Sequence, residues 1–221
     1  MYIVDYMVRQ PVRIKLDTTV SVAQKLLQTH NFRHLSVVDD KGCLLGMVTD
    51  RDLRSAQPSS MLATAERQEE QKRLADTPIK KIMARKNLFL TPDCTLDDAL
   101  LLLNREKTGA LPVVDEAKYV LGIFSIRDLI KAYTKLYGIG EIGSIMIALQ
   151  HDGQPKPLSR LTHVLEEYDI RFSRLIRSVA KRKKPDDIIY LRVHTYNINA
   201  VYLILRKAGV KMYEPLLALA H

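Results

Sequence analysis

The sequence has little cysteine, no tryptophan and no histidine spacing typical of a metal site. Its two cysteines, Cys43 and Cys94, lie far apart and form no CxxC motif, which argues against both a disulfide framework and a zinc centre. The six histidines follow neither the HxxxH nor the HExxH spacing. We therefore expect no metal site.

Long hydrophobic runs are also missing. Apolar runs such as 99–103 and 145–149 fall far short of the roughly 20 apolar residues that a helix needs to span a bilayer. The first residues lack the basic start of a secretion signal, and Asp5 stands where such a signal needs an apolar stretch. We expect a cytoplasmic protein with no membrane partner.

What is present is the composition of an ordinary globular protein, with 47% hydrophobic and 27% charged residues over 221 positions. This length predicts two or three compact domains. The formal net charge of +9 raises the question of a nucleic-acid partner, but only Lys181–Lys184 form a dense basic cluster. Two interpretations stay open: a solvated hairpin turn, which we favour, and, as the alternative, a nucleic-acid contact.

An internal repeat organises the first 135 residues. A shift of 76 residues aligns 7–53 with 83–129 without a gap. The aligned identities include Met7 with Met83, Asp17 with Asp93, Thr19 with Thr95, Gly46 with Gly122, and Arg51, Asp52 and Leu53 with Arg127, Asp128 and Leu129.

Each copy predicts the element order β-α-β-β-α. A short strand, at 12–15 or 88–91, precedes an apolar stripe with helical spacing. Two β-rich runs follow across a turn, and a second helix begins after Thr49 or Ser125. Since neither copy of roughly 50 residues can bury its faces alone, we expect the copies to pack as a pair. The expected boundaries are 1–57 and 79–136 for the two copies, and 58–78 for an exposed connector helix.

Both copies end in the same motif, Gly-x-x-(Thr/Ser)-x-Arg-Asp-Leu. Its hydroxyl and carboxylate are typical of a capping box at a helix start. They also suit a ligand, because a helix N-terminus attracts phosphate, arginine adds donors, and a carboxylate can accept ribose hydroxyls. The two roles are compatible, and the glycine leaves room for a ligand or a backbone segment. The candidate residues are Thr49, Arg51, Asp52, Ser125, Arg127 and Asp128.

With this repeat, element order and motif, residues 7–135 resemble the CBS domain family, whose repeats occur in pairs and bind ligands in the cleft between copies. The resemblance implies that Thr49 and Asp52, and equally Ser125 and Asp128, hold a ribose and a nearby phosphate. From their position, we infer phosphate contacts for Arg51 and Arg127. The positions that match the family's purine contacts are Val12, His34 and Leu35, and Leu88, Ala110 and Leu111. Alternatively, the apolar residues among these belong to the core, and His34 is a packing histidine at a helix end.

Residues 141–221 contain no third copy. Strands are expected at 144–149, 170–179, 187–193 and 210–213, and helices at 158–165 and 197–208, in the order β-α-β-β-α-β. Asn197 is the expected N-cap of the last helix, and Gly209 follows its end. Residues 143–214 resemble the ACT domain family, which often binds amino acids at subunit interfaces, although loop 152–155 carries the family's Asp, Gly and Pro in a different order.

The expected fold is therefore α+β, with two β-α-β-β-α CBS repeats packed as a pair and a ferredoxin-like ACT-type domain after them. This combination resembles bacterial acetoin-utilisation accessory proteins. It implies a regulatory sensor of adenosine nucleotides: AMP, ADP or ATP, with S-adenosylmethionine and cyclic dinucleotides sharing the adenosine part. Occupancy would pass to the ACT-like domain or to an unidentified target protein. We expect a homodimer, because such modules leave apolar faces that a second subunit covers. No nucleophile elbow, P-loop or Gly-rich dinucleotide motif occurs, so we expect no enzymatic activity.

Overall fold

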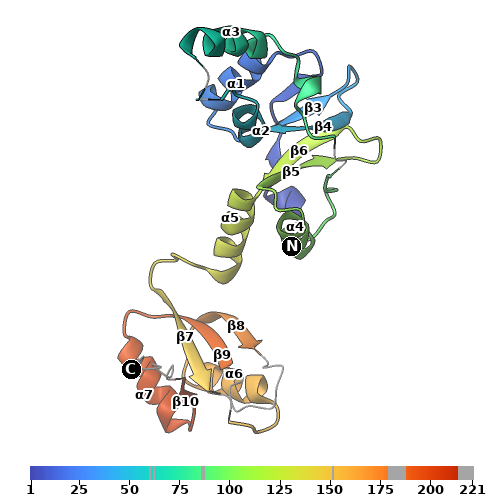
Figure 1. Ribbon diagram of the computed structural model, residues 1–221. Coiled ribbons are helices and arrows are strands. Elements are labelled where there is room, and N and C mark those ends of the chain that lie inside the picture. Colours follow the sequence, from blue (N-terminus) through green and yellow to red (C-terminus); the bar gives the residue numbers. More distant parts are fainter. Residues whose placement is uncertain (60, 62, 86–87, 151, 179–187, 214–221) are drawn as a thin grey trace. The chain divides into compact units, whose positions relative to one another are not determined.

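The computed structural model describes residues 1–59, 61, 63–85, 88–150, 152–178 and 188–213. The chain divides into two compact units, Met1–Tyr133 and Thr134–His221 (Figure 1). The basic cluster Lys181–Lys184 lies outside the described residues, and so does the nucleic-acid alternative that rests on it. Among the described residues, no helix has both the length and the apolar character needed to cross a membrane.

The first repeat has the predicted β-α-β-β-α order. β2 (Arg13–Lys15) runs parallel to β3 (His34–Val38), and β3 pairs antiparallel with β4 (Leu44–Thr49). The helices are α1 (Val20–Thr29) and α2 (Asp50–Ser55). The apolar stripe of α1 packs against the sheet, which confirms the helical spacing. The buried core residues are Ile14, Val20, Ala23, Leu27, Leu35, Val37, Val48, Leu53 and Ile79.

The second repeat contains α4 (Leu96–Arg105), β5 (Ala110–Val114), β6 (Val120–Ser125) and α5 (Ile126–Tyr137). Its predicted first strand is reduced to one parallel bridge between Leu90 and Val113. Leu90 donates to Pro112 O at 2.9 Å and accepts from Val114 N at 2.9 Å. The next bond of this ladder would need an N–H at Pro112, which proline lacks, so the strand cannot extend to Leu88.

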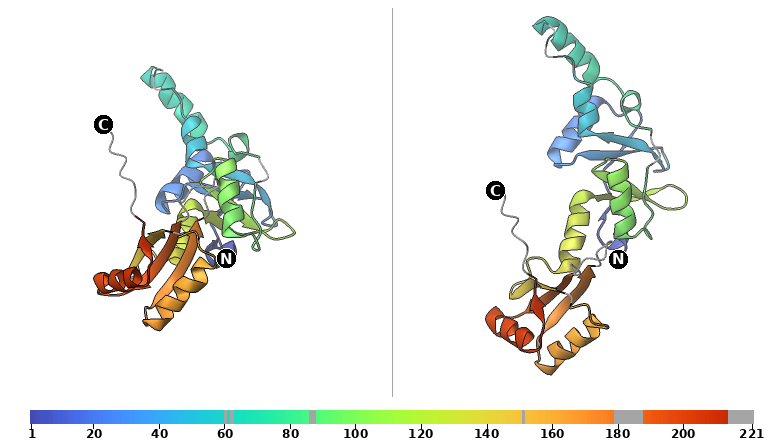
Figure 2. Two further views of the ribbon diagram at one scale, coloured as in Figure 1. Left: turned by 90° about the horizontal axis from the view of Figure 1, so that it is seen from below. Right: turned by 60° about the horizontal axis from the view of Figure 1, so that its bottom comes forward.

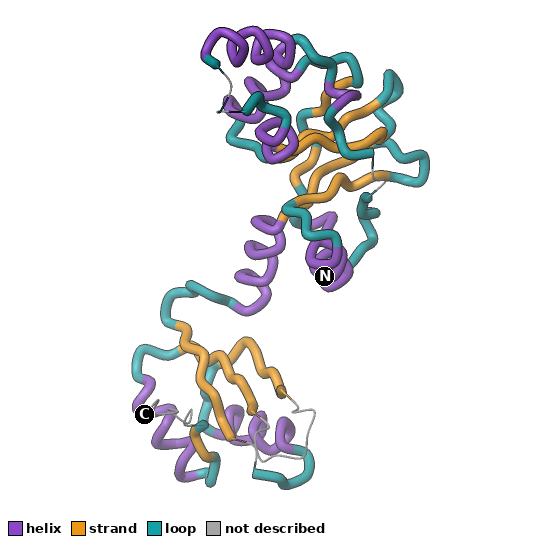
Figure 3. The backbone as a smooth tube through the Cα atoms, in the orientation of Figure 1, coloured by secondary structure: helices purple, strands orange, loops and turns teal. Residues whose placement is uncertain are grey.

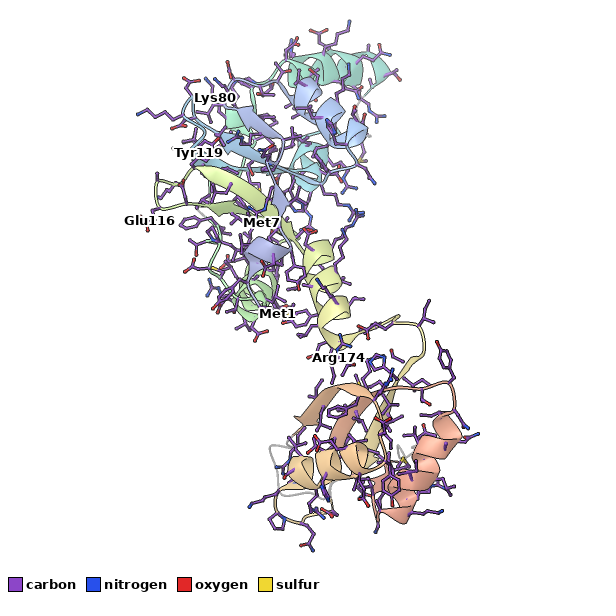
Figure 4. The ribbon with its side chains drawn as sticks, turned by 180° about the vertical axis from the view of Figure 1, so that it is seen from behind. Met1, Met7, Lys80, Glu116, Tyr119 and Arg174 are labelled. Atoms are coloured by element: carbon purple, nitrogen blue, oxygen red, sulfur yellow. The ribbon has the colours of Figure 1, made fainter. Side chains whose placement is uncertain are left out.

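The two repeats exchange their leading segments. The 3₁₀ turn η1 (Ile3–Asp5) places Ile3 in the core of the second repeat, and β1 (Val8–Arg9) pairs with β6. Correspondingly, η2 (Ile79–Lys81) places Ile79 in the core of the first repeat. Figure 4 labels Met7, which lies between η1 and β1 in the first exchanged segment. Each repeat is therefore completed by residues that precede the other repeat in the chain.

The hairpin turns of the two repeats bind each other. Leu44 N donates to Lys118 O at 2.9 Å, and Val120 N donates to Gly42 O at 3.1 Å. Gly42 has a φ of +86°, and a Cβ there would come within 2.5 Å of the Tyr119 ring. Only glycine meets both demands, because other residues rarely adopt this φ and none lacks a Cβ. Beneath these bonds, Val38, Leu44, Val114 and Val120 form a shared core.

The segment between the repeats contains an exposed helix. α3 (Thr64–Ala75) buries none of its residues. It is the outermost helix of the first unit in both views of Figure 2. Its charged composition explains this position, since Leu74 is the one described residue of the helix that packs against the core of the first repeat.

The C-terminal unit has the predicted β-α-β-β-α-β order: β7 (Ser144–Gln150), α6 (Pro157–Glu167), β8 (Phe172–Ser178), β9 (Ile188–His194), α7 (Ile198–Lys207) and β10 (Lys211–Met212). The antiparallel sheet has the order β10-β7-β9-β8. α6 and α7 pack into one core with the sheet (Figure 3). Asn197 Oδ1 caps α7 by accepting from Ala200 N at 3.2 Å, and Gly209 follows the helix with a φ of +77°, as predicted.

Candidate functional site

In the first repeat, the end of β4 and the start of α2 form a closed capping box. The Thr49 hydroxyl accepts from Asp52 N at 3.2 Å and donates to Asp52 Oδ2 at 2.7 Å. The same carboxylate oxygen accepts from Thr49 N at 2.8 Å. The capping role predicted from the motif is therefore confirmed.

The second repeat builds the same arrangement at the start of α5. Ser125 Oγ donates to Asp128 Oδ2 at 2.6 Å, and Ser125 N donates to that oxygen at 3.0 Å. Asp128 N completes the box by donating to Ser125 Oγ at 3.4 Å. The Asp128 residue is only 6% exposed, whereas Asp52 is half-buried.

In both boxes, the cap uses one carboxylate oxygen and leaves the other. Asp52 Oδ1 has no hydrogen-bond partner among the described residues, and Asp128 Oδ1 has only Lys131 Nζ at 4.0 Å. Each site therefore retains a carboxylate acceptor at a helix N-terminus.

A third capping box occurs outside the repeated motif. Thr95 and Asp98 form the same bonds at the start of α4, where Asp98 is exposed. The hydrogen bond from Thr95 lowers the pKa of the Asp98 carboxyl. Because this box lacks the preceding glycine and following arginine of the motif, a capping box alone does not identify a ligand site.

The motif glycines leave space for the backbone of the exchanged segments. A Cβ at Gly46 would come within 2.5 Å of Ala84 O, and one at Gly122 within 2.8 Å of Val8 O. The sequence left open whether a ligand or a backbone segment needs this space. In the structure, the backbone of the other repeat's leading segment occupies it.

Strand register brings the purine-side and ribose-side candidates together. In the antiparallel pairs, His34 is the Cα partner of Thr49, and Ala110 is the Cα partner of Ser125. Residues separated by 15 positions in each copy thus lie side by side at one end of each hairpin.

His34 reaches from the first repeat to the second. A Cβ added at Gly109 would lie 3.0 Å from His34 Cε1 and 3.4 Å from Nε2. Burial lowers the pKa of His34, opposed by the nearby Asp52 carboxylate, so the neutral imidazole is favoured. Gly109 was missed from the sequence, although the repeat alignment gives a signal, since it stands where the first copy has Arg33.

The remaining candidates differ in accessibility. Leu35 and Leu111 are fully buried in the cores of the two repeats, and Ala110 is 1% exposed. Their side chains belong to the core, as the alternative interpretation held, so only their backbone atoms can contact a ligand. Val12 and Leu88 are half-buried. Arg51 and Arg127 are exposed, and neither guanidinium forms an ion pair within the described part of the chain.

The C-terminal unit has its own hollows. A cavity of about 590 Å³ is lined by residues that include Arg171, His194 and Asn197. A smaller one of about 70 Å³ lies beside the loop after β7, where Arg160 Nη2 binds both oxygens of Asp152 at 2.7 and 2.8 Å. Among the residues described, no His, Cys, Asp and Glu cluster could hold a metal ion.

Two exchanged β-α-β-β-α repeats with equivalent hydroxyl–carboxylate boxes define a pseudosymmetric paired-repeat module. The sequence profile of the CBS domain matches residues 3–59 and 79–135, which together make up more than half of the chain. The chain therefore belongs to the CBS domain family.

Similar proteins include both small CBS proteins and longer enzymes. A CBS domain-containing protein of Dictyostelium discoideum is 32% identical over 123 residues, which cover 56% of this chain and 84% of that protein. An inosine-5'-monophosphate dehydrogenase of Aquifex aeolicus is 29% identical over 126 residues, or 57% of this chain. The chain spans only 23% of that enzyme's length.

Two solved structures have a similar fold at 26% identity and a TM-score of 0.53. One is a Vibrio cholerae protein assigned to acetoin utilization (AcuB), where the match covers 64% of this chain and 96% of the other. The second is CBSX2 in complex with AMP, where it covers 62% and 98%.

Proposed function

We propose that this protein is a regulatory sensor that binds adenosine-containing nucleotides in the cleft between its CBS repeats. The observation that carries the proposal is the carboxylate oxygen that the cap leaves unused, beside a hydroxyl, at equivalent helix entries in both repeats. CBSX2, a structure with the same fold, is in complex with AMP, which supports an adenosine ligand. ADP, ATP, S-adenosylmethionine and cyclic dinucleotides share the adenosine part and belong to the same class.

Each group in the proposed sites has a distinct role. Asp52 and Asp128 accept ribose hydroxyls through Oδ1 while Oδ2 continues to cap the helix. The exposed Arg51 and Arg127 lie in the first helical turn, where backbone N–H groups also favour phosphate. Val12 and His34 in the first repeat, and Leu88 in the second, border the purine, with backbone atoms of Leu35, Ala110 and Leu111.

The C-terminal unit completes the proposed sensor. The strand order β10-β7-β9-β8, with both helices packed into one core, supports a ferredoxin-like domain of the ACT type. In this proposal, nucleotide occupancy changes the CBS pair, and residues 141–221 or an unidentified target protein respond. The protein acts as a cytoplasmic homodimer and catalyses no reaction. Such regulation requires that the ligand bind one arrangement better, and a coupling of about 1 to 3 kcal/mol is typical.

Calorimetric titration with AMP and ATP tests the sites in Asp52→Ala, Asp128→Ala and the double variant. Loss of the ribose bonds is expected to lower affinity tenfold to a hundredfold at the altered site, since charge-assisted hydrogen bonds contribute about 1.5 to 3 kcal/mol.

Asp98→Ala is the matched control, because it breaks an identical capping box outside the proposed sites. All three substitutions should cost about 0.5 to 2 kcal/mol of unfolding free energy by urea titration. Only the site variants should lose ligand affinity. Unchanged affinity in the double variant contradicts the ribose role.

A further inference from the structure

One helix belongs to both units of the chain. α5 begins directly after Ser125, so Asp128 lies in its first turn, while Thr134 and the residues after it belong to the C-terminal unit. Its 12 residues correspond to about 18 Å of helix. The α2 helix of the first repeat differs, because it has only six residues and is followed by the exposed connector.

The last turn of α5 is closed by a glycine and an arginine. Gly138, with a φ of +64°, donates to Lys135 O at 3.2 Å, and Ile139 N donates to Thr134 O at 2.9 Å. This is the Schellman arrangement of helix ends. Arg174, from β8, then donates from Nη2 to Lys135 O at 3.0 Å and from Nε to Leu136 O at 2.9 Å. These bonds satisfy carbonyls that a helix end otherwise leaves to water.

The same guanidinium holds the segment that follows. Arg174 Nη1 binds Glu141 Oε2 at 2.8 Å, and Nη2 binds Glu141 Oε1 at 3.0 Å, which makes the pair bidentate. A Cβ at Gly138 would lie 2.4 Å from Arg174 Nη1, so a larger residue would have to displace the guanidinium, and the φ of +64° also favours glycine. Figure 4 labels Arg174 beside the end of α5. One side chain therefore binds the helix end and the residue three positions after Gly138.

We propose that Arg174 is a positioning residue that couples the second repeat's site, and not the first, to the C-terminal unit through α5. This inference rests on the proposed function. Negative charge at the helix N-terminus and the guanidinium at its C-terminus both interact favourably with the helix dipole. Helix formation is also cooperative, so stabilising one end of the helix stabilises the other. A phosphate at the start of α5 and Arg174 at its end thus stabilise the same element. Phosphate binding therefore strengthens the Arg174 contacts, and the Arg174 contacts strengthen phosphate binding, because coupling between two sites is reciprocal.

Hydrogen exchange of the full chain, with and without saturating AMP, tests the coupling at amides 134–143. AMP at 100 times its Kd can slow exchange by at most about a hundredfold. We expect about a tenfold slowing in the unaltered protein and in Asp52→Ala. We expect none in Asp128→Asn or in Arg174→Ala. Arg160→Ala is the control, since it removes an ion pair of the same unit with Asp152 and should respond to AMP like the unaltered protein.

Arg174→Lys separates geometry from charge. Lysine keeps the positive charge but cannot form the bidentate pair and the two carbonyl bonds together. We expect its 134–143 amides to stay as fast with AMP as those of Arg174→Ala. Slowing equal to that of the unaltered protein in either Arg174 variant or in Asp128→Asn overturns the proposal, as does bound AMP with no slowing in the unaltered chain.

A ligand-free double-mutant cycle distinguishes this failure from failure of the proposed function. Exchange of the α5 amides is compared in Asp128→Asn, Arg174→Ala and the double variant. If the change in exchange rate in the double variant differs at least threefold from the product of the two single changes, the result supports coupling along the helix. If it equals that product, the proposal is overturned. The effects of Asp52→Asn and Arg174→Ala on exchange should multiply, because the first repeat's site is not coupled through α5. If no adenosine ligand binds, the proposed function fails while this cycle still decides the coupling.

Discussion

The His34 imidazole lies against Gly109, which joins the start of β3 in one repeat to the residue before β5 in the other. The contact is close enough that any larger residue at position 109 must displace the ring. Since His34 is also the register partner of Thr49, the contact places the second repeat's backbone at the first repeat's proposed site.

Gly109→Val is expected to destabilise the protein by about 1 to 3 kcal/mol through overpacking against His34. Urea unfolding measures this loss. His34→Ala removes the ring, so the double variant should recover much of the loss. If the valine costs the same free energy with and without the imidazole, the two residues are not in contact.

The pH dependence of stability should report on His34. Burial lowers its folded-state pKa below the ordinary 6.5, so near that pH the unfolded chain binds more protons than the folded protein. This contribution to stability is present above the unfolded pKa and is lost as the pH falls from about 6.5 to the lower folded pKa.

His34→Gln removes the titrating group and should therefore flatten the stability profile between pH 7.5 and 5.5. Urea titrations of both proteins at these values make the comparison. An unchanged slope in His34→Gln contradicts the assignment.

Ile3→Ala should weaken the second repeat, although Ile3 stands at the head of the first. Its side chain is fully buried with Leu111 and Phe124, and truncation of such a residue costs about 2 to 5 kcal/mol. Amide exchange should accelerate in β5 and β6 more than in β3. Ile79→Ala is the matched variant, and it should reverse this pattern. Equal acceleration in both repeats would argue against the exchange of segments.

The chain is expected to form a homodimer. Leu101 and Ile130 are 66% and 60% exposed on helices of the CBS unit, and a second subunit can cover such side chains. Light scattering at micromolar concentration should give about twice the 25.2 kDa of one chain. A mass of 25.2 kDa would contradict the dimer.

The sequence alone determined the repeat, the helix caps and the element order, except for the first strand of the second repeat, which is a single bridge. Thr49 with Asp52, and Asn197 with Ala200, are three positions apart, so their bonds follow from local backbone geometry that short patterns encode. The exposure of α3 follows from its largely charged and polar composition.

Other features depended on contacts between residues far apart in the chain. Ile3 enters the second repeat's core, and Gly46 admits Ala84 O, since exchanged segments complete each sheet. No local propensity encodes the partner of a strand edge or an apolar side chain, because any sheet of the right register could accept it. The same holds for Arg174, whose guanidinium donates to the carbonyl of Leu136 in α5, 38 positions earlier in the chain. The sequence therefore determined which groups could bind a ligand, while the tertiary structure decided which of them remain accessible and which helix links them to the rest of the chain.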